Sequence, residues 1–403
     1  MLAYLNELGL VCALGNDKQQ VAEALFNGDS SGLQAQAGWI PGRSLPVGAV
    51  RGELPGIPTG LQRHATRNNR LLLAAALQIE PALRDAISRF GGSRIAVVLG
   101  TSTSGIDESS QGIRHHHRHG ELPPSFDYTQ QELAAPATFL ADWLGLSGPC
   151  HVISTACTSS GRALQSARRL LRLGLCDAVL CGGVDSLCQL TLNGFAALEA
   201  VSTERCNPFS ANRHGINIGE GAALFLMTRE PGRIALLGAG ASSDAHHISA
   251  PAPDGSGARK AMLKALADAR LEAGQIAYLN LHGTATQHND SMESLAVQAL
   301  FPEGVPCSSS KPLSGHTLGA AAALEAAFCW LCLSPYNAHG RLPPHRWDGQ
   351  SDPTLPPLSL VSDANPTLPA QAPRYLMSNS FAFGGNNVSL ILGEVHDESG
   401  VSR

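Results

Sequence analysis

The segment STACTSS (residues 154–160) places one cysteine, Cys157, among six small residues. The residues HVI (151–153) before it predict the end of a strand, and GRALQSARRLLRLG (161–174) after it predicts an amphipathic helix. A strand that passes through a short turn into a helix is the repeating unit of α/β proteins. A cysteine at this junction is either a small core residue or a nucleophile. A nucleophile is physically reasonable here because the unpaired N–H groups and the positive dipole end at the start of the predicted helix favour a thiolate.

The same alternation of strand and helix extends over most of the chain. Apolar strands separated by helices indicate sheets that are covered on both faces. The predicted strands are 93–102, 150–157, 177–186, 232–243, 276–284 and 375–394, and the predicted helices are 137–146, 161–174, 258–271, 289–301 and 318–334. Because the second half repeats the alternation of strands and helices of the first, we predict a duplicated α/β fold with halves 1–235 and 236–403. The Pro-rich stretch 335–372 is predicted to be a surface loop.

The composition indicates a compact globular protein, since 43% of the 403 residues are hydrophobic and 15% are charged. A net charge of −5 argues against nucleic acid as a ligand. Residues 1–17 lack the basic start of a signal peptide. The apolar segment 318–334 contains Glu325 and is too short to span a bilayer comfortably. We therefore expect a soluble, cytoplasmic protein without a membrane span.

Two further patterns resemble metal sites. Cys329 and Cys332 form a C-x-x-C pair, but no second pair or histidine spacing completes a zinc site, so the prediction is core packing. The run RHHHRHG (114–120) also contains metal-ligand residue types. Adjacent histidines cannot all converge on one ion from a regular element, so we predict a solvated loop there and no metal site.

Three stretches in the second half carry further candidate catalytic residues. NLHGTATQHND places His282 at the end of a strand, and SSSKPLSGHTLGAAAALEA places Lys311 and His316 just before a helix. In NSFAFGGNN (379–387), glycines either allow a tight turn or bring backbone N–H groups close to a reacting oxygen. A lone histidine in such a position is more often a hydrogen-bonded core residue than a catalyst, so no single stretch decides between the two.

Together, and in this order, the motifs resemble those of the β-ketoacyl-[acyl-carrier-protein] synthases of the elongating type, within the thiolase superfamily. The stretch SSDAHHISAPAPDG (242–255) belongs to the same set, so the resemblance covers nearly the whole chain. It implies a five-layered αβαβα fold built from two duplicated halves. It also implies a homodimer, or a heterodimer with a chain-length-factor-like synthase, that works with an acyl carrier protein.

The resemblance assigns catalytic roles to five residues. Cys157 matches the acyl-accepting nucleophile, and His282 and His316 match the two active-site histidines. Lys311 and Glu325 match a lysine and a glutamate that support the second histidine.

Further residues are assigned to substrate contacts by the same resemblance. Thr284 and Thr286 match threonines that hold the pantetheine arm, and Phe383 matches a gating phenylalanine. The backbone N–H groups of Phe383 and Cys157 would form an oxyanion hole. Thr103 and Ile216 fall where the family shapes its acyl pocket, with Thr103 at the dimer interface. The residues expected to dock the acidic carrier are Arg63, Arg67, Arg70 and Arg213.

The function implied is a decarboxylative Claisen condensation. An acyl group on Cys157 reacts with malonyl-carrier protein and gives a 3-ketoacyl-carrier product and CO₂, in fatty acid or polyketide synthesis. No cofactor is expected, since the phosphopantetheine arrives on the carrier. A thiolase would need a second cysteine late in the chain, and no cysteine follows Cys332. The alternative is a non-catalytic or decarboxylase-only partner subunit resembling a chain-length factor, although such a subunit lacks the nucleophile.

Several positions depart from the family pattern. In PFSANRHGI (208–216), serine, histidine and isoleucine replace an acid, an acid and an aromatic residue. Ala382 precedes Phe383 where glycine is usual, and Asn386 replaces threonine. AFGGNN (382–387) and RNNRLLLAAAL (67–77) resemble instead the synthases of aryl-polyene pigment clusters. We therefore expect a specialised pathway, with ordinary fatty-acid synthesis as the alternative.

Overall fold

The computed structural model describes residues 2–362 and 367–395. Its first half contributes the strands β1 (Tyr4–Cys12), β4 (Ile95–Gly100), β5 (Cys150–Ile153), β6 (Ala178–Asp185) and β7 (Gly221–Thr228) to the main sheet. Its second half contributes β8 (Ile234–Ser243), β9 (Ile276–Asn280), β10 (Cys307–Ser308), β11 (Tyr375–Phe381) and β12 (Asn386–Glu394). A separate hairpin consists of β2 (Leu33–Ile40) and β3 (Arg43–Gly48).

The two halves have the same strand plan. Hydrogen bonds link the ten strands in the order β10-β9-β11-β12-β8-β1-β7-β6-β4-β5, and β8 meets β1 at the pair Tyr4–Ala235. On each side of this junction, three parallel strands are followed by two antiparallel ones. This repetition of the strand plan agrees with the duplication that the sequence predicted from its repeated alternation of strands and helices. The boundary predicted between residues 235 and 236 falls inside β8, whose first residue is Ile234.

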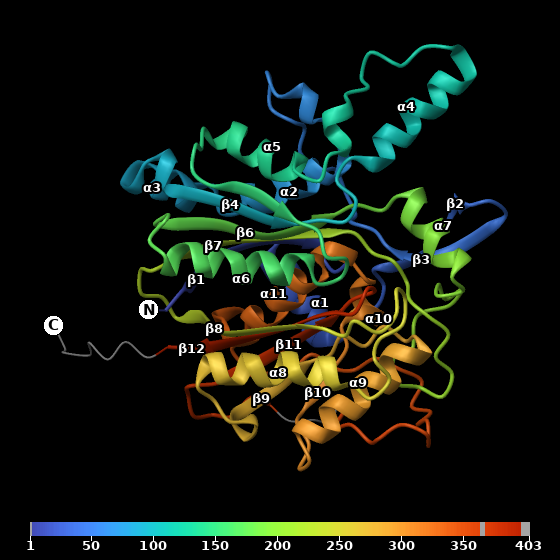
Figure 1. Ribbon diagram of the computed structural model, residues 1–403, viewed down its shortest axis with the longest axis vertical. Helices are drawn as coiled ribbons and strands as arrows, with labels where there is room; N and C mark the ends of the chain where they lie inside the picture. The colour runs from blue at the N-terminus through green and yellow to red at the C-terminus, as the bar shows by residue number, and fades with distance from the viewer. Residues whose placement is uncertain (1, 363–366, 396–403) are drawn as a thin grey trace.

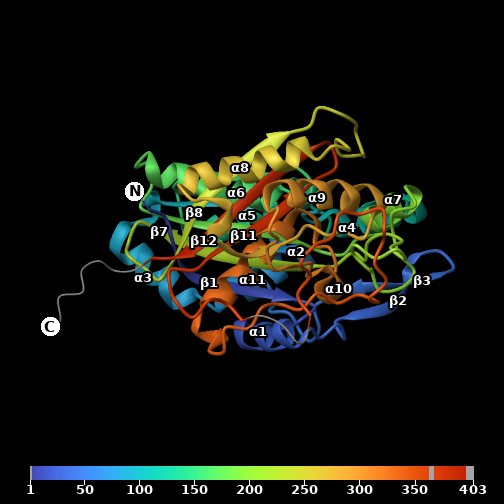
Figure 2. The same cartoon turned by 90° about the horizontal axis from the view of Figure 1, so that it is seen from below.

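The five strands of each half form one β layer, and helices form the other three layers of the molecule (Figure 1). The outer layer of the first half contains α2 (Arg67–Leu77), α3 (Glu80–Phe90) and α5 (Ala135–Leu144). The central layer contains α6 (Ser159–Arg172) and α11 (Ala321–Leu333), with α1 (Lys18–Asn27) beside α11. The outer layer of the second half contains α8 (Ser256–Ala269) and α9 (Gln287–Leu300), which lie in front of its strands in Figure 2. The predicted five-layered αβαβα architecture is therefore confirmed.

Side chains on the two faces of each strand pack into different hydrophobic clusters. In β4, Ile95, Val97 and Leu99 pack with α2 and α5, whereas Ala96 and Val98 face the central helices. This alternation explains why the strand is apolar at every position. α11 is buried along its whole length, including Cys329 and Cys332, which fits the core packing predicted for that pair. Among the described residues, no helix combines the length and the apolar character needed to cross a bilayer.

Three local expectations are corrected by the structure. The histidine run is not a loop, because it forms the last turns of α4 (Ile106–His119), which ends at the left-handed Gly120. Its solvent exposure is as predicted, and histidines and arginines suit a helix C-terminus because they carry or can acquire positive charge there. Strand β7 and the β2–β3 hairpin were not anticipated. Residues 342–345, within the predicted surface loop, are buried, and residues 363–366 of that stretch lie outside the described residues.

The remaining α-helices of the described residues are α4, α7 (Gln189–Ala197), which packs against β2, and α10 (Lys311–Ser314), which precedes the short 3₁₀ helix η5 (Leu318–Ala320). The turn between α10 and η5 carries His316. Because η5 and α11 pack against α6, residues from both halves meet where β5 leads into α6.

Candidate active site

Cys157 lies in the turn between β5 and α6, two residues before Ser159 begins the helix. Its neighbour Ala156 has a φ of 52°, a left-handed conformation that costs energy for a residue with a Cβ. The start of α6 also packs closely on β4, because a Cβ at Gly100 would lie 2.2 Å from the backbone nitrogen of Ser160. The sequence thus forces a tight strand-to-helix turn that points Cys157 into the interior, where it is 6% exposed.

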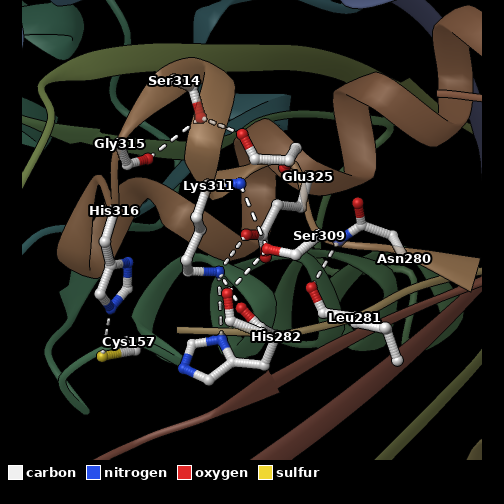
Figure 3. A network of polar contacts seen from close by, with 12 residues as sticks. Cys157, Asn280, Leu281, His282, Ser309, Lys311, Ser314, Gly315, His316 and Glu325 are labelled. Carbon is white, nitrogen blue, oxygen red and sulfur yellow. Dashed lines mark hydrogen bonds and ion pairs between the residues drawn. The ribbon is translucent and has the colours of Figure 1, made fainter. Parts of the chain in front are cut away.

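His316 reaches this cysteine from the second half of the chain. Its Nε2 lies 3.0 Å from the Sγ of Cys157, as Figure 3 shows. The backbone N–H of His316 donates to the carbonyl of Asn217 at 2.7 Å, and its carbonyl accepts from Gly219 at 2.9 Å. The preceding Gly315 has a φ of 72°, which only glycine adopts easily. A rigid turn therefore fixes the imidazole against the sulfur.

His282 lies at the end of β9, and its ring makes an edge-on contact with that of His316 at 5.3 Å between centroids. The carboxylate of Glu293, in α9, accepts hydrogen bonds from the backbone N–H groups of His282 and Gly283, both at 2.8 Å. Sequence reasoning missed Glu293. Its helical neighbours are polar on one side, Asn289 and Asp290, and apolar on the other, Ala296 and Val297, so no regular pattern marked it. The sulfur of Cys157 and one ring nitrogen from each histidine lie within 4.8 Å of one another.

Lys311 supports His282 and not His316, which corrects the role assigned from the resemblance. Its Nζ donates to the carbonyl of His282 at 2.5 Å, lies 3.4 Å from Nδ1 of that ring, and pairs with Glu325 Oε1 at 2.5 Å (Figure 3). An ammonium group only donates, so Nδ1 of His282 accepts and its proton resides on Nε2. The lysine therefore fixes the tautomer of His282 as well as its position.

Burial shifts the pKa of all three reactive side chains toward the neutral form. Desolvation, followed by the nearby charge of Lys311, lowers the pKa of both His282 and His316 well below the usual value. Desolvation raises the pKa of Cys157 to about 12, although Lys311 opposes the rise. This direction is opposite to the thiolate-favouring effect expected from the helix N-terminus, because desolvation of the buried sulfur is the largest contribution.

Two backbone N–H groups, those of Cys157 and Phe383, face the sulfur and also lower the pKa of the thiol. Their convergence has the geometry that the proposed oxyanion hole requires. The Phe383 ring lies 5.5 Å from that of Phe195, a contact that the sequence did not indicate.

A cavity of about 440 Å³ opens onto these groups. Of the residues predicted to contact substrate, Thr284, Thr286, Ile216 and Phe383 line it, together with Cys157 and both histidines. The two threonine hydroxyls lie 2.9 Å apart. Arg213 and His214 also line the cavity, beside Ile216.

Thr103 is not among the cavity-lining residues. Its hydroxyl donates to Asp185 Oδ1 at 2.8 Å and accepts from the backbone N–H of Ser186 at 3.2 Å. Asp185, which sequence reasoning missed, also accepts hydrogen bonds from the backbone of Ser102 at 2.8 Å and of Gly319 at 2.5 Å. It therefore ties the loop after β4 to the segment that leads from His316 into α11.

The four arginines predicted to dock a carrier are not equivalent. Arg63 has a side chain that is 59% exposed and pairs with Asp142 at 2.7 Å. The guanidinium of Arg70 donates to the carbonyls of Leu54 and Pro55, so it fastens the segment before α2. Arg63 is the one of the four that presents most of its side chain to solvent.

Arg213 does not fit a docking role, and that prediction is wrong. Its side chain is 2% exposed and forms an ion pair with Asp352 at 2.6 Å. Arg213 therefore holds the Pro-rich segment 335–372 against the residues that line the cavity. Arg67 is half-buried, and its Nε donates to Glu220 at 2.7 Å. Because Glu220 is fully buried, this arginine mainly compensates an internal charge.

Comparison with known proteins agrees with this geometry. Residues 51–231 match the model of the β-ketoacyl synthase N-terminal domain, and residues 234–346 match that of the C-terminal domain. The nodulation protein E of Rhizobium meliloti (strain 1021) is 30% identical over 96% of this chain and 98% of its own. A putative mitochondrial 3-oxoacyl-[acyl-carrier-protein] synthase of Schizosaccharomyces pombe is 31% identical over 95% and 96%.

Among solved structures, a ketosynthase (ApeO) in complex with its chain length factor (ApeC) from Xenorhabdus doucetiae is similar over 98% of both chains. The two chains are 46% identical and superpose with a TM-score of 0.92. The fold, the matched domain models and the relatives agree. The chain belongs to the β-ketoacyl synthase family.

Proposed function

We propose that this protein catalyses decarboxylative condensation of a Cys157-bound acyl group with a malonyl-acyl-carrier protein. Membership of the β-ketoacyl synthase family supports a condensing acyltransferase activity in fatty acid or polyketide synthesis. The observation that carries the finer assignment is the 3.0 Å contact between Cys157 Sγ and His316 Nε2 inside a cavity that both histidines line.

In the first step, the acyl thioester carbonyl enters beside Cys157. His316 is neutral and can accept the thiol proton as the sulfur attacks, then return it to the departing pantetheine sulfur. The negative oxygen of the tetrahedral intermediate lies against the N–H groups of Cys157 and Phe383. The products are an acyl-enzyme thioester and a free carrier thiol.

In the second step, malonyl-carrier enters, its C–C bond breaks, and CO₂ leaves. The electron pair forms a thioester enolate, whose oxygen accepts hydrogen bonds from Nε2–H of His282 and His316. His316 can serve in both steps because its Nδ1 has no hydrogen-bond partner among the described residues, so neither tautomer is locked. The enolate carbon attacks the acyl group on Cys157. The sulfur leaves as a thiolate and takes up a proton from solvent, which restores the Cys157 thiol.

The proposal requires no metal and no bound organic cofactor. The carboxylate of malonate is itself the activating group, since its loss generates the nucleophilic carbon. The phosphopantetheine arm belongs to the carrier substrate, and Thr284 and Thr286 line the cavity where the arm would lie.

The proposed partners are an acyl carrier protein and a second synthase subunit. The ApeO ketosynthase, 46% identical to this chain, was solved with a chain length factor, which supports a heterodimer of that kind. The alternative is a homodimer. Native mass spectrometry of the purified chain, alone and co-expressed with a chain-length-factor-like partner, distinguishes the two assemblies.

The condensing role is tested by the intact mass of the protein after incubation with acyl-carrier protein. Wild type should gain the mass of the acyl group, and subsequent malonyl-carrier should remove it and release the 3-ketoacyl product. Cys157→Ala should show neither change while keeping the circular dichroism of the wild type. Condensation by Cys157→Ala would overturn the assignment. A wild type that decarboxylates malonyl-carrier without acylation would favour the partner-subunit alternative.

We further propose an aryl-polyene-type substrate, a conjugated chain that cannot bend. Ile216 lines the cavity where the family usually has an aromatic ring, and Ala382 restricts the backbone beside Phe383. The test is a competition between saturated and polyunsaturated acyl carriers of equal length, measured as relative kcat/KM. A preference for the saturated chain would support ordinary fatty-acid synthesis instead.

A further inference from the structure

We infer that the C-terminal turns of α4 bind a divalent transition-metal ion through the imidazoles of His115 and His119. The helix projects away from the layered body of the molecule (Figure 1). The site is separate from the cavity around Cys157, and the inference does not depend on the proposed function.

The prediction of no metal site rested on adjacent histidines being unable to converge on one ion, but the helix brings together two histidines that are four residues apart. Residues four apart lie on the same face of an α-helix, and the ring centroids of His115 and His119 are 4.4 Å apart with an interplanar angle of 38°. Metal–nitrogen distances of about 2.0–2.1 Å allow one ion to bridge two rings at this separation after small side-chain rotations. Histidines four apart on a helix are also the pair with which metalloprotease helices hold zinc.

The surroundings of the pair leave room for an ion and its water ligands. His115 is half-buried, and His119 is exposed. The carbonyl groups at the end of the helix carry partial negative charge, which favours a cation. Arg114 is turned aside, because its guanidinium donates to Gln189 of α7. Arg118, in the same turn, opposes a cation by its charge, but its exposure allows solvent and salt to screen that effect.

The donor set indicates which ions bind. Imidazole nitrogen prefers Ni²⁺, Cu²⁺ and Zn²⁺ to the hard ions Mg²⁺ and Ca²⁺. With two protein ligands and water in the remaining positions, the site is exchangeable. A bound ion would link the last two turns of α4 and restrict their fraying.

The experiment is a calorimetric titration with Ni²⁺ and Zn²⁺, with Mg²⁺ as the hard-ion control. It is performed on protein that carries both Cys157→Ala and His282→Ala, because Cys157, His282 and His316 hold ligand atoms within 4.8 Å and form a competing site, of which Cys157→Ala alone would leave both imidazoles. Cu²⁺ is avoided, since it oxidises thiols. In this background we expect one saturable site for Ni²⁺ and for Zn²⁺, and none for Mg²⁺.

The variants test the assignment to the pair. His115→Ala and His119→Ala should each weaken binding at least about tenfold, since the second imidazole binds in an intramolecular step. His117→Ala, which removes an exposed histidine from a different face of the same turn, should leave the affinity unchanged. An equal loss in His117→Ala, or no saturable site in the starting protein, would overturn the inference.

Amide hydrogen exchange gives a second readout that is independent of calorimetry. Ni²⁺ should slow exchange in the peptide that covers the end of α4, and His119→Ala should abolish this protection. Protection that persists in His119→Ala would place the ion elsewhere and would also contradict the assignment.

Discussion

The Sγ of Cys157 lies 3.0 Å from the Nε2 of His316, although the two residues are 159 positions apart in the chain. Burial raises the pKa of the thiol to about 12 and lowers that of the imidazole well below its usual value. Both groups are therefore neutral at rest, and the contact is a thiol donating to an imidazole. Acyl transfer must then move the proton in the same step as the sulfur attacks.

This charge state predicts how alkylation of Cys157 depends on pH. Because the folded-state pKa is raised, the thiolate is a minor species at neutral pH, and its fraction grows about tenfold per pH unit below the pKa. The rate of iodoacetamide modification should therefore rise with near-unit logarithmic slope between about pH 7 and about pH 10.

Site-resolved mass spectrometry separates Cys157 from the exposed Cys150 in this measurement. A plateau already reached by about pH 8 would instead indicate a thiolate–imidazolium pair, and would contradict the neutral resting state.

The two histidines should differ in which half-reaction they affect. His316 contacts the sulfur, whereas His282 is held by Lys311. His282→Ala should slow CO₂ release by roughly 10²–10³ as an oxyanion donor is lost, with a smaller effect on acylation. His316→Ala should slow both steps. Single-turnover acylation and malonyl decarboxylation are measured separately, and identical profiles for the two variants would refute this division.

The Lys311–Glu325 pair should behave as a coupled unit. Both side chains are nearly fully buried, so Lys311→Met leaves an uncompensated carboxylate and should cost about 3–5 kcal/mol of unfolding free energy. Lys311→Met combined with Glu325→Gln should cost less than the sum of the single changes. Urea unfolding of the four proteins measures the coupling, and additive costs would show that the pair is not coupled.

Arg63 and Arg213 should separate carrier docking from stability. Arg63 is mostly exposed, so Arg63→Glu should raise KM for a carrier-bound acyl group but not for a short pantetheine thioester. Arg213→Ala removes the buried partner of Asp352 and should lower the thermal midpoint. If Arg63→Glu changes both KM values alike, docking does not involve Arg63.

Much of the fold could be predicted because the signals are local. Uninterrupted apolar runs such as that of β4 require cover on both faces, and their repetition in the second half indicated the duplication. Strand β7 was missed although it is equally apolar. The two-residue strand β10 is too short to give a periodic signal at all. The histidine run was misjudged because consecutive polar residues carry no helical periodicity of their own, whereas its helix is set by the preceding turns of α4.

The sequence by itself determined that Cys157 sits at a strand-to-helix turn of small residues, and that two histidines of the other half each lie beside a glycine. Those are properties of neighbouring residues, fixed by backbone sterics and side-chain size. Only the tertiary structure decided that Lys311 serves His282, that Glu293 anchors His282, and that Arg213 is interior. Each of these three contacts depends on which distant segments of the chain pack together. The charge and role of an ionisable side chain are set by how deeply it is buried and which group it contacts, and residue type alone does not reveal either.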